Sequence, residues 1–279
     1  MTQHFSDAHF MKLASLAHRE AGLLIPPGKK SMIHSRLSNR LRALKLADFG
    51  EYHDFVTSPK GADERKKMIS ALTTNVTSFF REQHHFDLLK EDVIPELVKQ
   101  AKAGHPVRLW SAGCSSGPEP FSIAMSLIEN IADIDRLDIR ILATDIDTNM
   151  IQTAKRGFYN EREISGVDEG RKKRFLTPAN MDGQSGYLMH DNLRKLIAFR
   201  ELNLLSKWPM KGTFDVIFCR NVVIYFDEQT QDNLWSRFKK IMKPGGWLIV
   251  GHSERLGEGQ MQDIQSAGVT TYRKTAAKA

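Results

Sequence analysis

The first quarter of the chain carries apolar residues at helical spacing and no run that predicts a strand. One apolar stripe predicts a helix over residues 7–20, which Ser6 would cap: Phe10, Leu13, Leu16 and Ala17. A second stripe, within Lys29–Leu46, has the spacing of one buried helix face: Ile33, Leu37, Leu41 and Leu44. Asp48 is expected to cap a third helix, and residues 62–72 to form a fourth. We therefore predict an all-helical domain over residues 1–75.

From about Glu82 onward, short continuous apolar runs alternate with amphipathic segments. After a helix through Ala101, the predicted strands are Val107–Ser111, Ile139–Thr144, Leu196–Leu202, Phe214–Cys219 and Trp247–Gly251. The predicted helices between them are Phe121–Ala132, Thr148–Arg156 and Glu228–Met242. This alternation predicts a doubly wound parallel α/β sheet over residues 76–279. Ligands of such sheets bind beyond the carboxyl ends of the strands.

Residues from about 158 to 200 interrupt the alternation with a long, polar, turn-rich stretch. Short runs that could be extended lie on either side of Gly183 and Gly186: Arg171–Phe175, Tyr187–His190 and Leu196–Phe199. A connection of this length is usually functional or disordered. We predict a small antiparallel β insertion here.

Composition and charge narrow the class of protein. Hydrophobic residues make up 41% and charged residues 26%, and no apolar run reaches the length of a membrane span. The N-terminus has no apolar signal core, and only two cysteines are present, so we expect a cytoplasmic protein. Of the net charge of +7, residues 1–75 carry five units, with 12 Lys/Arg against 7 Asp/Glu.

This basic surplus has two interpretations. It could simply provide solubility, or it could attract an acidic partner by long-range steering. Lys29, Arg36 and Arg40 fall along one flank of the second apolar stripe, where they could bind such a partner or only cover apolar neighbours with their aliphatic stems.

The first candidate ligand site is the glycine-containing loop from Ser111 to Glu119. Gly113 and Gly117 allow a sharp turn and close approach of the backbone to a ligand, and the following helix offers free N–H groups. The loop lacks the pattern of a phosphate-binding P-loop and the G-x-G-x-x-G of dinucleotide sites in register. NAD and ATP are therefore disfavoured as ligands.

Three further elements follow predicted strands. Asp145 stands where a carboxylate can accept both hydroxyl hydrogens of a ribose, while Asp147 is more simply a helix cap. Arg220, Asn221 and Tyr225 come directly after a buried strand, which should lie beside the first strand. A Lys243-Pro-Gly-Gly246 turn leads into the last predicted strand.

In this order, these motifs resemble the class I S-adenosylmethionine methyltransferases. More specifically, the chain resembles the bacterial chemotaxis receptor glutamate O-methyltransferases (CheR family) over nearly its whole length. The resemblance is carried by Asn75-Val-Thr-Ser-Phe-Phe-Arg-Glu82, Trp110-Ser-Ala-Gly113, Gly117-Pro-Glu-Pro120, Ala143-Thr-Asp-Ile-Asp147, Asn203-Leu-Leu205 and Cys219-Arg-Asn-Val-Val-Ile-Tyr-Phe226. One departure is Pro118, where the family commonly has an acidic residue.

The resemblance implies a Rossmann-like fold that binds S-adenosylmethionine and releases S-adenosylhomocysteine. The implied cofactor-binding residues are Asn75, Thr77, Arg81, Gly113, Glu119, Asp145, Asn203, Leu204, Arg220 and Asn221. Of these, Asn75, Thr77 and Arg81 would close over the methionine end, Glu119 would lie near the amino group, and Asn203 and Leu204 near adenine. Arg81, Arg220 and Tyr225 would act at the reacting end.

The implied reaction transfers the methyl group to the γ-carboxylate of receptor glutamates, for sensory adaptation. A glutamate side chain is ionised at neutral pH, so the reaction needs alignment rather than a general base. In the resembled family the helical domain faces the acidic methylation region of the receptor, which would make Lys29, Arg36 and Arg40 substrate-binding residues. The β insertion could also bind the receptor's C-terminal peptide by strand addition.

Other polar residues have plainer interpretations. His84 and His85 are expected on a helix surface, and no metal site is predicted because no cluster has ligand spacing. His252 is expected to be structural, and Cys114 and Cys219 to be small buried residues. Two rival functions remain open: a nucleic-acid methyltransferase, given the basic pI, and a non-catalytic cofactor-binding regulator.

Overall fold

The computed structural model describes residues 5–275 of the 279. Residues 1–4, which begin the segment expected to lack an export signal, and residues 276–279 lie outside this range. The described chain forms two compact units, one made of residues up to 74 together with 225–230, and the other of residues 75–224 and 231 onward. No helix among the described residues is long and apolar enough to cross a membrane.

The first unit is helical, as the apolar stripes predict. Its four α-helices are α1 (Asp7–Ala21), α2 (Lys30–Leu44), α3 (Phe49–Thr57) and α4 (Ala62–Leu72). The two predicted caps are present: Ser6 Oγ accepts from His9 N at 3.1 Å, and Asp48 Oδ1 accepts from Gly50 N at 2.8 Å. The predicted stripes are buried except at Leu44, in the last turn of α2, which is only partly buried.

The second unit contains a seven-stranded sheet in the order β6-β2-β1-β7-β8-β10-β9. Its strands are β1 (Val107–Ala112), β2 (Ile139–Asp145), β6 (Ile197–Glu201), β7 (Phe214–Cys219), β8 (Met242–Val250), β9 (Ile264–Gly268) and β10 (Thr271–Lys274). The first five are parallel, which confirms the predicted doubly wound core. Strands β10 and β9 add an antiparallel edge that the sequence analysis did not predict.

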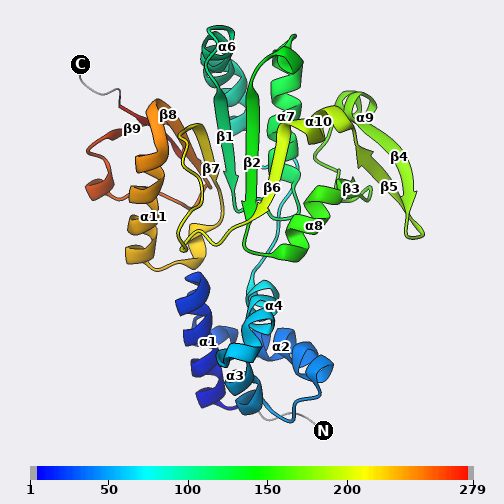
Figure 1. Cartoon of the computed structure of the whole chain (residues 1–279), viewed down its shortest axis with the longest axis vertical. Helices are drawn as coiled ribbons and strands as arrows, with labels where there is room; N and C mark the ends of the chain where they lie inside the picture. Colours follow the sequence, from blue (N-terminus) through cyan, green and yellow to red (C-terminus); the bar gives the residue numbers. More distant parts are fainter. Residues whose placement is uncertain (1–4, 276–279) are drawn as a thin grey trace. The chain divides into compact units, whose positions relative to one another are not determined.

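Helices connect these strands (Figure 1). They are α5 (His84–Leu88), the π-helical turn Leu89–Val93, α6 (Ile94–Lys102), α7 (Pro118–Asn130), α8 (Thr148–Arg156), α10 (Asp191–Leu196) and α11 (Glu228–Ile241). Helix α7 packs against β2 and β6, and α6 against β1. The π turn ends two residues before Pro95, which has no N–H for a regular helical hydrogen bond.

The predicted β insertion is present, with one error in its boundaries. Strands β3 (Phe158–Tyr159), β5 (Gln184–Met189) and β4 (Leu176–Met181) form a separate antiparallel sheet in that order. Arg171–Phe175, expected to be extended, is instead helical within α9 (Glu169–Phe175). The reason is local: Asp168 Oδ1 caps this helix by accepting from Arg171 N at 3.0 Å.

Strand order determines where the ligand site lies. Strand β1 pairs in parallel with β2 on one side and β7 on the other, with Ser111 opposite both Ala143 and Phe218. The carboxyl ends of the three strands therefore meet at one edge. The residues that follow them, including Gly113, Asp145 and Arg220, are brought together there.

Candidate active site

The loop after β1 turns sharply because its two glycines have backbone conformations that side chains disfavour. Gly113 has φ 87° and Gly117 has φ 103°. A Cβ on Gly113 would lie 2.3 Å from Val222 Cγ2, and one on Gly117 would lie 2.7 Å from Tyr159 Oη. Tyr159 Oη also donates to Ser116 O at 2.7 Å. Close packing from two sides thus determines the shape of the loop.

Asp145 lies at the end of β2, against this loop. Its Oδ2 accepts from Ser115 N at 2.7 Å and its Oδ1 from Asp147 N at 2.9 Å. Burial raises the pKa of Asp145, and these backbone N–H groups oppose the rise. Each carboxylate oxygen keeps a second lone pair for a ligand hydroxyl. Asp147 caps α8 as predicted, accepting from Asn149 N at 2.9 Å.

The segment from Asn75 to Glu82 runs along these strand ends. Asn75 Nδ2 donates to Asp147 Oδ2 at 2.9 Å, and Asn75 O accepts from Ser115 Oγ at 3.0 Å. Further along, Phe80 N donates to Ser122 Oγ on α7 at 3.0 Å. Thr77 is half-buried between these two attachments. The segment is therefore tied both to the glycine loop and to the helix after it.

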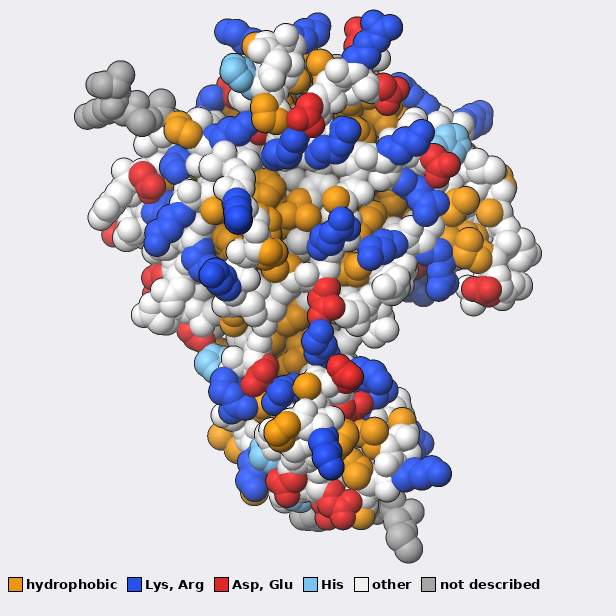
Figure 2. Space-filling model, viewed as in Figure 1, with side chains coloured by type: hydrophobic (Ala, Val, Ile, Leu, Met, Phe, Trp, Pro, Cys, Tyr) orange, Lys and Arg blue, Asp and Glu red, His pale blue; other side chains and the backbone are white. Residues whose placement is uncertain are grey.

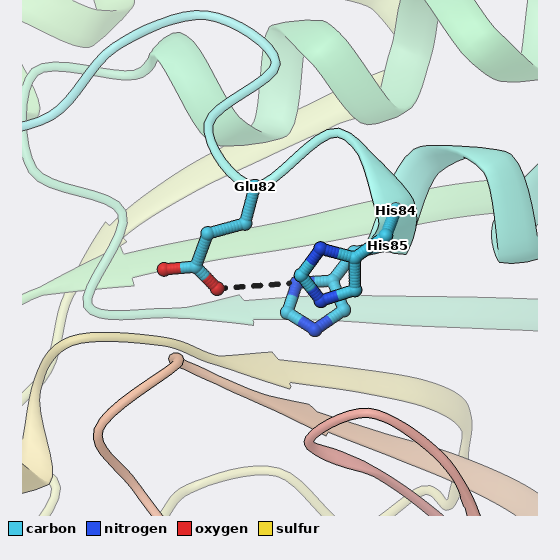
Figure 3. Close-up of side chains that lie close together, drawn as sticks. All are labelled: Glu82, His84 and His85. Atoms are coloured by element: carbon cyan, nitrogen blue, oxygen red, sulfur yellow. Dashed lines mark ion pairs between the residues drawn. The ribbon is translucent and has the colours of Figure 1, made fainter.

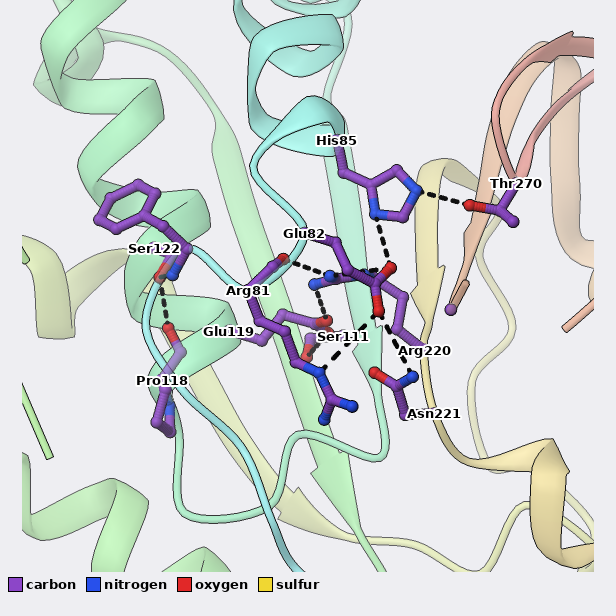
Figure 4. Close-up of polar contacts among 12 residues, drawn as sticks. Arg81, Glu82, His85, Ser111, Pro118, Glu119, Ser122, Arg220, Asn221 and Thr270 are labelled. Carbon is purple, nitrogen blue, oxygen red and sulfur yellow. Dashed lines mark hydrogen bonds and ion pairs between the residues drawn. The ribbon is translucent and has the colours of Figure 1, made fainter. Parts of the chain in front are cut away.

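Arg220 and Glu119 form a buried ion pair at the end of β7. Arg220 Nη1 donates to Glu119 Oε2 at 3.0 Å, and Ser111 Oγ donates to Glu119 Oε1 at 2.7 Å (Figure 4). Arg220 Nη2 also donates to the backbone carbonyl of Arg81. The side chain of Arg220 is only 2% exposed, whereas that of Arg81 is 31% exposed. Of the two arginines, Arg81 is the more accessible to a substrate.

Glu82 is a site residue that the sequence analysis missed. Its carboxylate oxygens lie near five nitrogen atoms: Arg220 Nη2 at 3.3 Å, Arg81 Nε at 3.9 Å, His252 Nδ1 at 3.2 Å, Asn221 Nδ2 at 3.4 Å and His85 Nδ1 at 3.5 Å. Burial alone would raise the pKa of Glu82, but Arg220 and the two histidines outweigh it and lower the pKa. The sequence signal was its place at the end of the Asn75–Glu82 motif, directly after Arg81.

The prediction that His84 and His85 both lie on a helix surface is wrong for His85. His84 is exposed, but His85 is completely buried, and its Nε2 is hydrogen-bonded to Thr270 Oγ1 at 2.8 Å. Burial, together with Arg220 and His84, lowers the pKa of His85 to about 3, so its ring is neutral. Glu82, His84 and His85 come close enough to offer one ligand atom each within 4.8 Å (Figure 3). Arg220 already neutralises the carboxylate of this group.

The loop after β7 is held by a second unpredicted carboxylate, that of Glu254. Glu254 is 2% exposed and accepts four backbone N–H bonds. The donors are Asn221 N at 2.9 Å, Val222 N at 2.8 Å, Val223 N at 2.9 Å and Gly251 N at 2.6 Å. Asn221 has φ 59°, a conformation uncommon for a side-chain-bearing residue. Glu254 therefore stabilises the loop that presents Arg220 and Asn221.

The remaining predicted cofactor residues follow β6. Leu202 N donates to Asp145 O at 2.9 Å, which attaches the end of β6 to the end of β2. Asn203 Oδ1 then accepts from Leu205 N at 2.9 Å, and Leu204 is buried. Asn203 and Leu204 thus belong to the same edge of the sheet as Asp145.

Four of the predicted site residues belong to the first compact unit: Lys29, Arg36, Arg40 and Tyr225. Tyr225 is grouped with the first unit, where its carbonyl accepts from Leu24 N at 2.7 Å. Lys29 is exposed. Arg36 donates to Leu72 O and Thr73 O, and Arg40 forms a two-bond pair with Glu64.

The two cysteines are buried free thiols, as predicted. Cys114 lies in the loop after β1 and Cys219 at the end of β7. Burial raises the pKa of both well above the usual value. Neither thiol is poised as a nucleophile.

The residues at this edge fit an adenosine-containing sulfonium cofactor. The glycine loop permits close backbone approach, Asp145 keeps acceptor capacity for ribose hydroxyls, and Glu119 offers a carboxylate in the first turn of α7. Arg220 Nε and Glu82 Oε2 are buried without hydrogen-bond partners, as expected where a ligand completes a polar network. Fold and site together define a class I S-adenosylmethionine-dependent methyltransferase.

Comparison with known proteins identifies the family. Residues 75–273 match the model described as CheR methyltransferase, SAM binding domain, and residues 8–73 match CheR methyltransferase, all-alpha domain. The chain belongs to the CheR methyltransferase family.

Relatives of nearly the same length support this membership. A probable chemotaxis protein methyltransferase of Rhizobium etli is 44% identical over 93% of this chain and 97% of its own length. The chemotaxis protein methyltransferase of Escherichia coli is 38% identical over 89% of this chain and 85% of its own length. That of Salmonella typhimurium is 36% identical over 100% of this chain and 95% of its own length.

Proposed function

We propose that the protein transfers the methyl group of S-adenosylmethionine to the γ-carboxylate of glutamates in the cytoplasmic region of methyl-accepting chemotaxis receptors. The observation that carries the proposal is the match of both units to the CheR family, together with relatives named chemotaxis protein methyltransferases at near full length. Action on that region of a receptor would place the protein in the cytoplasm.

The reacting end suits an acceptor that is already ionised. A glutamate side chain has a reference pKa of about 4.3, so it attacks the methyl carbon as a carboxylate without a general base. When bound, the cofactor supplies an activated methyl group on sulfur. The protein has to align the carboxylate and exclude water.

We assign different roles to the two arginines. Arg220 is almost fully buried and already bonded to Glu119, so its role is to maintain the cofactor site rather than to hold the substrate. Arg81 is partly exposed, and its Nη1 donates only to Val76 O among the hydrogen bonds described, at 3.0 Å. Arg81 is the better candidate to position the substrate carboxylate. Tyr225 is proposed as a further positioning residue at the methyl group.

The cofactor roles are proposed residue by residue. Asp145 would accept the ribose hydroxyls, Glu119 would lie near the amino group, and Gly113 would permit close approach of the loop. The other proposed cofactor contacts are Asn75, Thr77 and Arg81 at the methionine end, Asn203 and Leu204 at adenine, and Arg220 and Asn221 at the reacting end.

We further propose that the first unit recognises the receptor. Lys and Arg side chains are interspersed with Asp and Glu on the helical unit (Figure 2). Lys29 is exposed and can approach an acidic partner. Arg36 and Arg40 already bond to groups of their own unit, so they would contribute mainly long-range charge.

A receptor C-terminal peptide is proposed as a second contact, at the β insertion. Strand β4 is one of the two outer strands of that three-stranded sheet, where an extended peptide could add by main-chain hydrogen bonds. A cavity of about 460 Å³ lies beside it, lined by Glu161, Pro178, Ala179, Asn180, Ser185, Gly186 and Tyr187. Pro178 lowers the number of N–H donors in β4 by one.

One assay separates the proposed function from its rivals. The protein is incubated with S-adenosylmethionine labelled in the methyl group and with either receptor-bearing membranes or RNA, followed by mild alkali. We expect volatile labelled methanol from the receptor sample, because carboxyl methyl esters hydrolyse and methylated bases do not. Label in RNA alone would support a nucleic-acid methyltransferase. Cofactor binding without turnover on either would support a regulator.

A further inference from the structure

The strongest unassigned feature is the position of Glu82 among residues of the proposed site. Its carboxylate contacts Arg220 at 3.3 Å, Asn221 at 3.4 Å and Arg81 at 3.9 Å, so one side chain touches three residues assigned to the reacting end. His252 and His85 complete its surroundings. Because these groups contact the carboxylate of Glu82 from several sides, it can adopt few alternative positions.

The backbone at Glu82 is in a costly conformation. Glu82 has φ 58° and Phe80 has φ 52°, and both lie in the left-handed region that disfavours residues with a Cβ. Such a conformation persists only where surrounding contacts maintain it, and it is concentrated at functional sites. Here the bond from Phe80 N to Ser122 and the burial of Phe80 maintain it.

Glu82 also balances the charge of the site. Two guanidinium groups, Arg81 and Arg220, face two carboxylates, Glu82 and Glu119. Without Glu82, Arg81 and Arg220 would together exceed Glu119 by one positive charge. A carboxylate substrate would then bind more strongly, but a strongly bound carboxylate is a weaker nucleophile, and a sulfonium cation would be bound less well.

We propose that Glu82 is a positioning residue for methyl transfer. It orients Arg81, Arg220 and Asn221, and it sets the charge of the reacting end so that a substrate carboxylate is aligned without being held too tightly. This inference rests on the proposed roles of those three residues. It adds to them a residue that acts through its contacts with Arg81, Arg220 and Asn221.

The test is Glu82→Gln, which keeps the shape of the side chain and removes its charge. We expect kcat for receptor methylation to fall at least tenfold while KM for the receptor stays the same or falls. In direct binding by calorimetry, Kd for S-adenosylmethionine should rise about threefold or more relative to Kd for S-adenosylhomocysteine, whose sulfur carries no charge. Glu82→Asp should restore part of this cofactor discrimination, because the charge returns.

Asp215→Asn is the matched control. Asp215 is also a buried carboxylate of the second unit, paired with Lys243 at 2.8 Å, but it lies at the opposite end of β7 from Arg220. This control should lose stability without changing the ratio of the two cofactor affinities. An unchanged ratio in Glu82→Gln, or a raised KM for the receptor, would overturn the proposal.

The binding measurement also separates this inference from the proposed function. If the wild-type protein methylates no receptor, the proposed substrate is wrong, but the ratio of cofactor affinities still tests the charge-balancing role of Glu82. If the receptor is methylated and Glu82→Gln behaves as Asp215→Asn does, only the role of Glu82 is wrong.

Discussion

Each unit pairs an arginine with a buried carboxylate, but only around Arg40 do the buried atoms of the pair all have hydrogen-bond partners. In the first unit, Arg40 donates to both oxygens of Glu64, at 2.8 and 2.6 Å, and Tyr52 Oη donates to the same carboxylate at 3.1 Å. In the second unit, Arg220 lies between Glu119 and Glu82. There, Arg220 Nε, Glu82 Oε2 and His85 Nδ1 are buried without hydrogen-bond partners, although Glu82 Oε2 lies 3.3 Å from Arg220 Nη2.

This difference separates a structural ion pair from a binding site. A buried polar network that is fully bonded has nothing left to offer a ligand, whereas incomplete networks cost stability and are retained where a ligand completes them. The Arg40–Glu64 pair therefore maintains the helical unit, although its arginine was expected to bind substrate. The incomplete cluster around Arg220 is where chemistry is expected.

The largest effect should come from removing the arginine of the incomplete cluster. Arg220→Met would leave Glu119 and Glu82 facing each other without their shared cation. We expect the affinity for S-adenosylhomocysteine to fall more than 100-fold and the free energy of unfolding to fall by about 3 kcal/mol. Calorimetry and urea unfolding would measure the two effects. Unchanged cofactor affinity would contradict the proposed site.

The matching change in the first unit should affect stability alone. Arg40→Met leaves Glu64 buried without its cation, which should cost about 3 kcal/mol. Affinity for S-adenosylhomocysteine should not change. The double variant Arg40→Met/Glu64→Leu should recover most of the lost stability in urea unfolding. A loss of cofactor affinity in either variant would remove the distinction between the two networks.

Acid should destabilise the protein through His85. Its pKa is about 3 when folded and about 6.5 when unfolded, so between these values the unfolded state binds the extra proton. Above pH 6.5, His85 is neutral in both the folded and the unfolded state, so its titration does not change the free energy of unfolding. As pH falls from 6.5 toward 3, it should lower the free energy of unfolding by up to about 1.4 kcal/mol per pH unit. His85→Gln should reduce this slope in urea unfolding at several pH values, and an unchanged slope would show that His85 does not contribute.

The smallest effect should come from the exposed lysine. Lys29→Glu should raise KM for the receptor a fewfold, more at low salt than at high salt, because exposed charges are screened. Stability and cofactor affinity should not change. The reason to test Lys29 rather than Arg40 is that a charge reversal at Arg40 would disrupt the pair with Glu64. No change in KM at low salt would argue against a receptor contact at Lys29.

The sequence predicted the features that depend on short stretches of chain. Helix caps such as Ser6 and Asp147 bond within three residues, and the buried parallel strands are continuous apolar runs. The antiparallel strands β9 and β10 escaped prediction because they are short and β9 is largely exposed. Arg171–Phe175 was wrongly taken as extended because the cap at Asp168 was overlooked.

The site could be predicted only in part, because its residues come together from distant parts of the chain. Positions after predicted strands pointed to Asp145 and Arg220, and the resemblance to a known family added Glu119. Neither spacing nor apolar pattern indicates that Arg220 meets Glu119, which is 101 residues away in sequence. The contact between His85 and Thr270 spans 185 residues. A histidine in a short helix looks like a surface residue until its contact with the turn between β9 and β10 is known.

The four backbone bonds of Glu254 have a consequence for how the protein is made. Three backbone N–H groups of the loop after β7 donate to the carboxylate of a residue more than thirty positions later in the chain. During synthesis, the glycine loop and Asp145 emerge well before this loop can be ordered. The proposed cofactor site is thus completed late, once the segment containing Glu254 has left the ribosome and folded back.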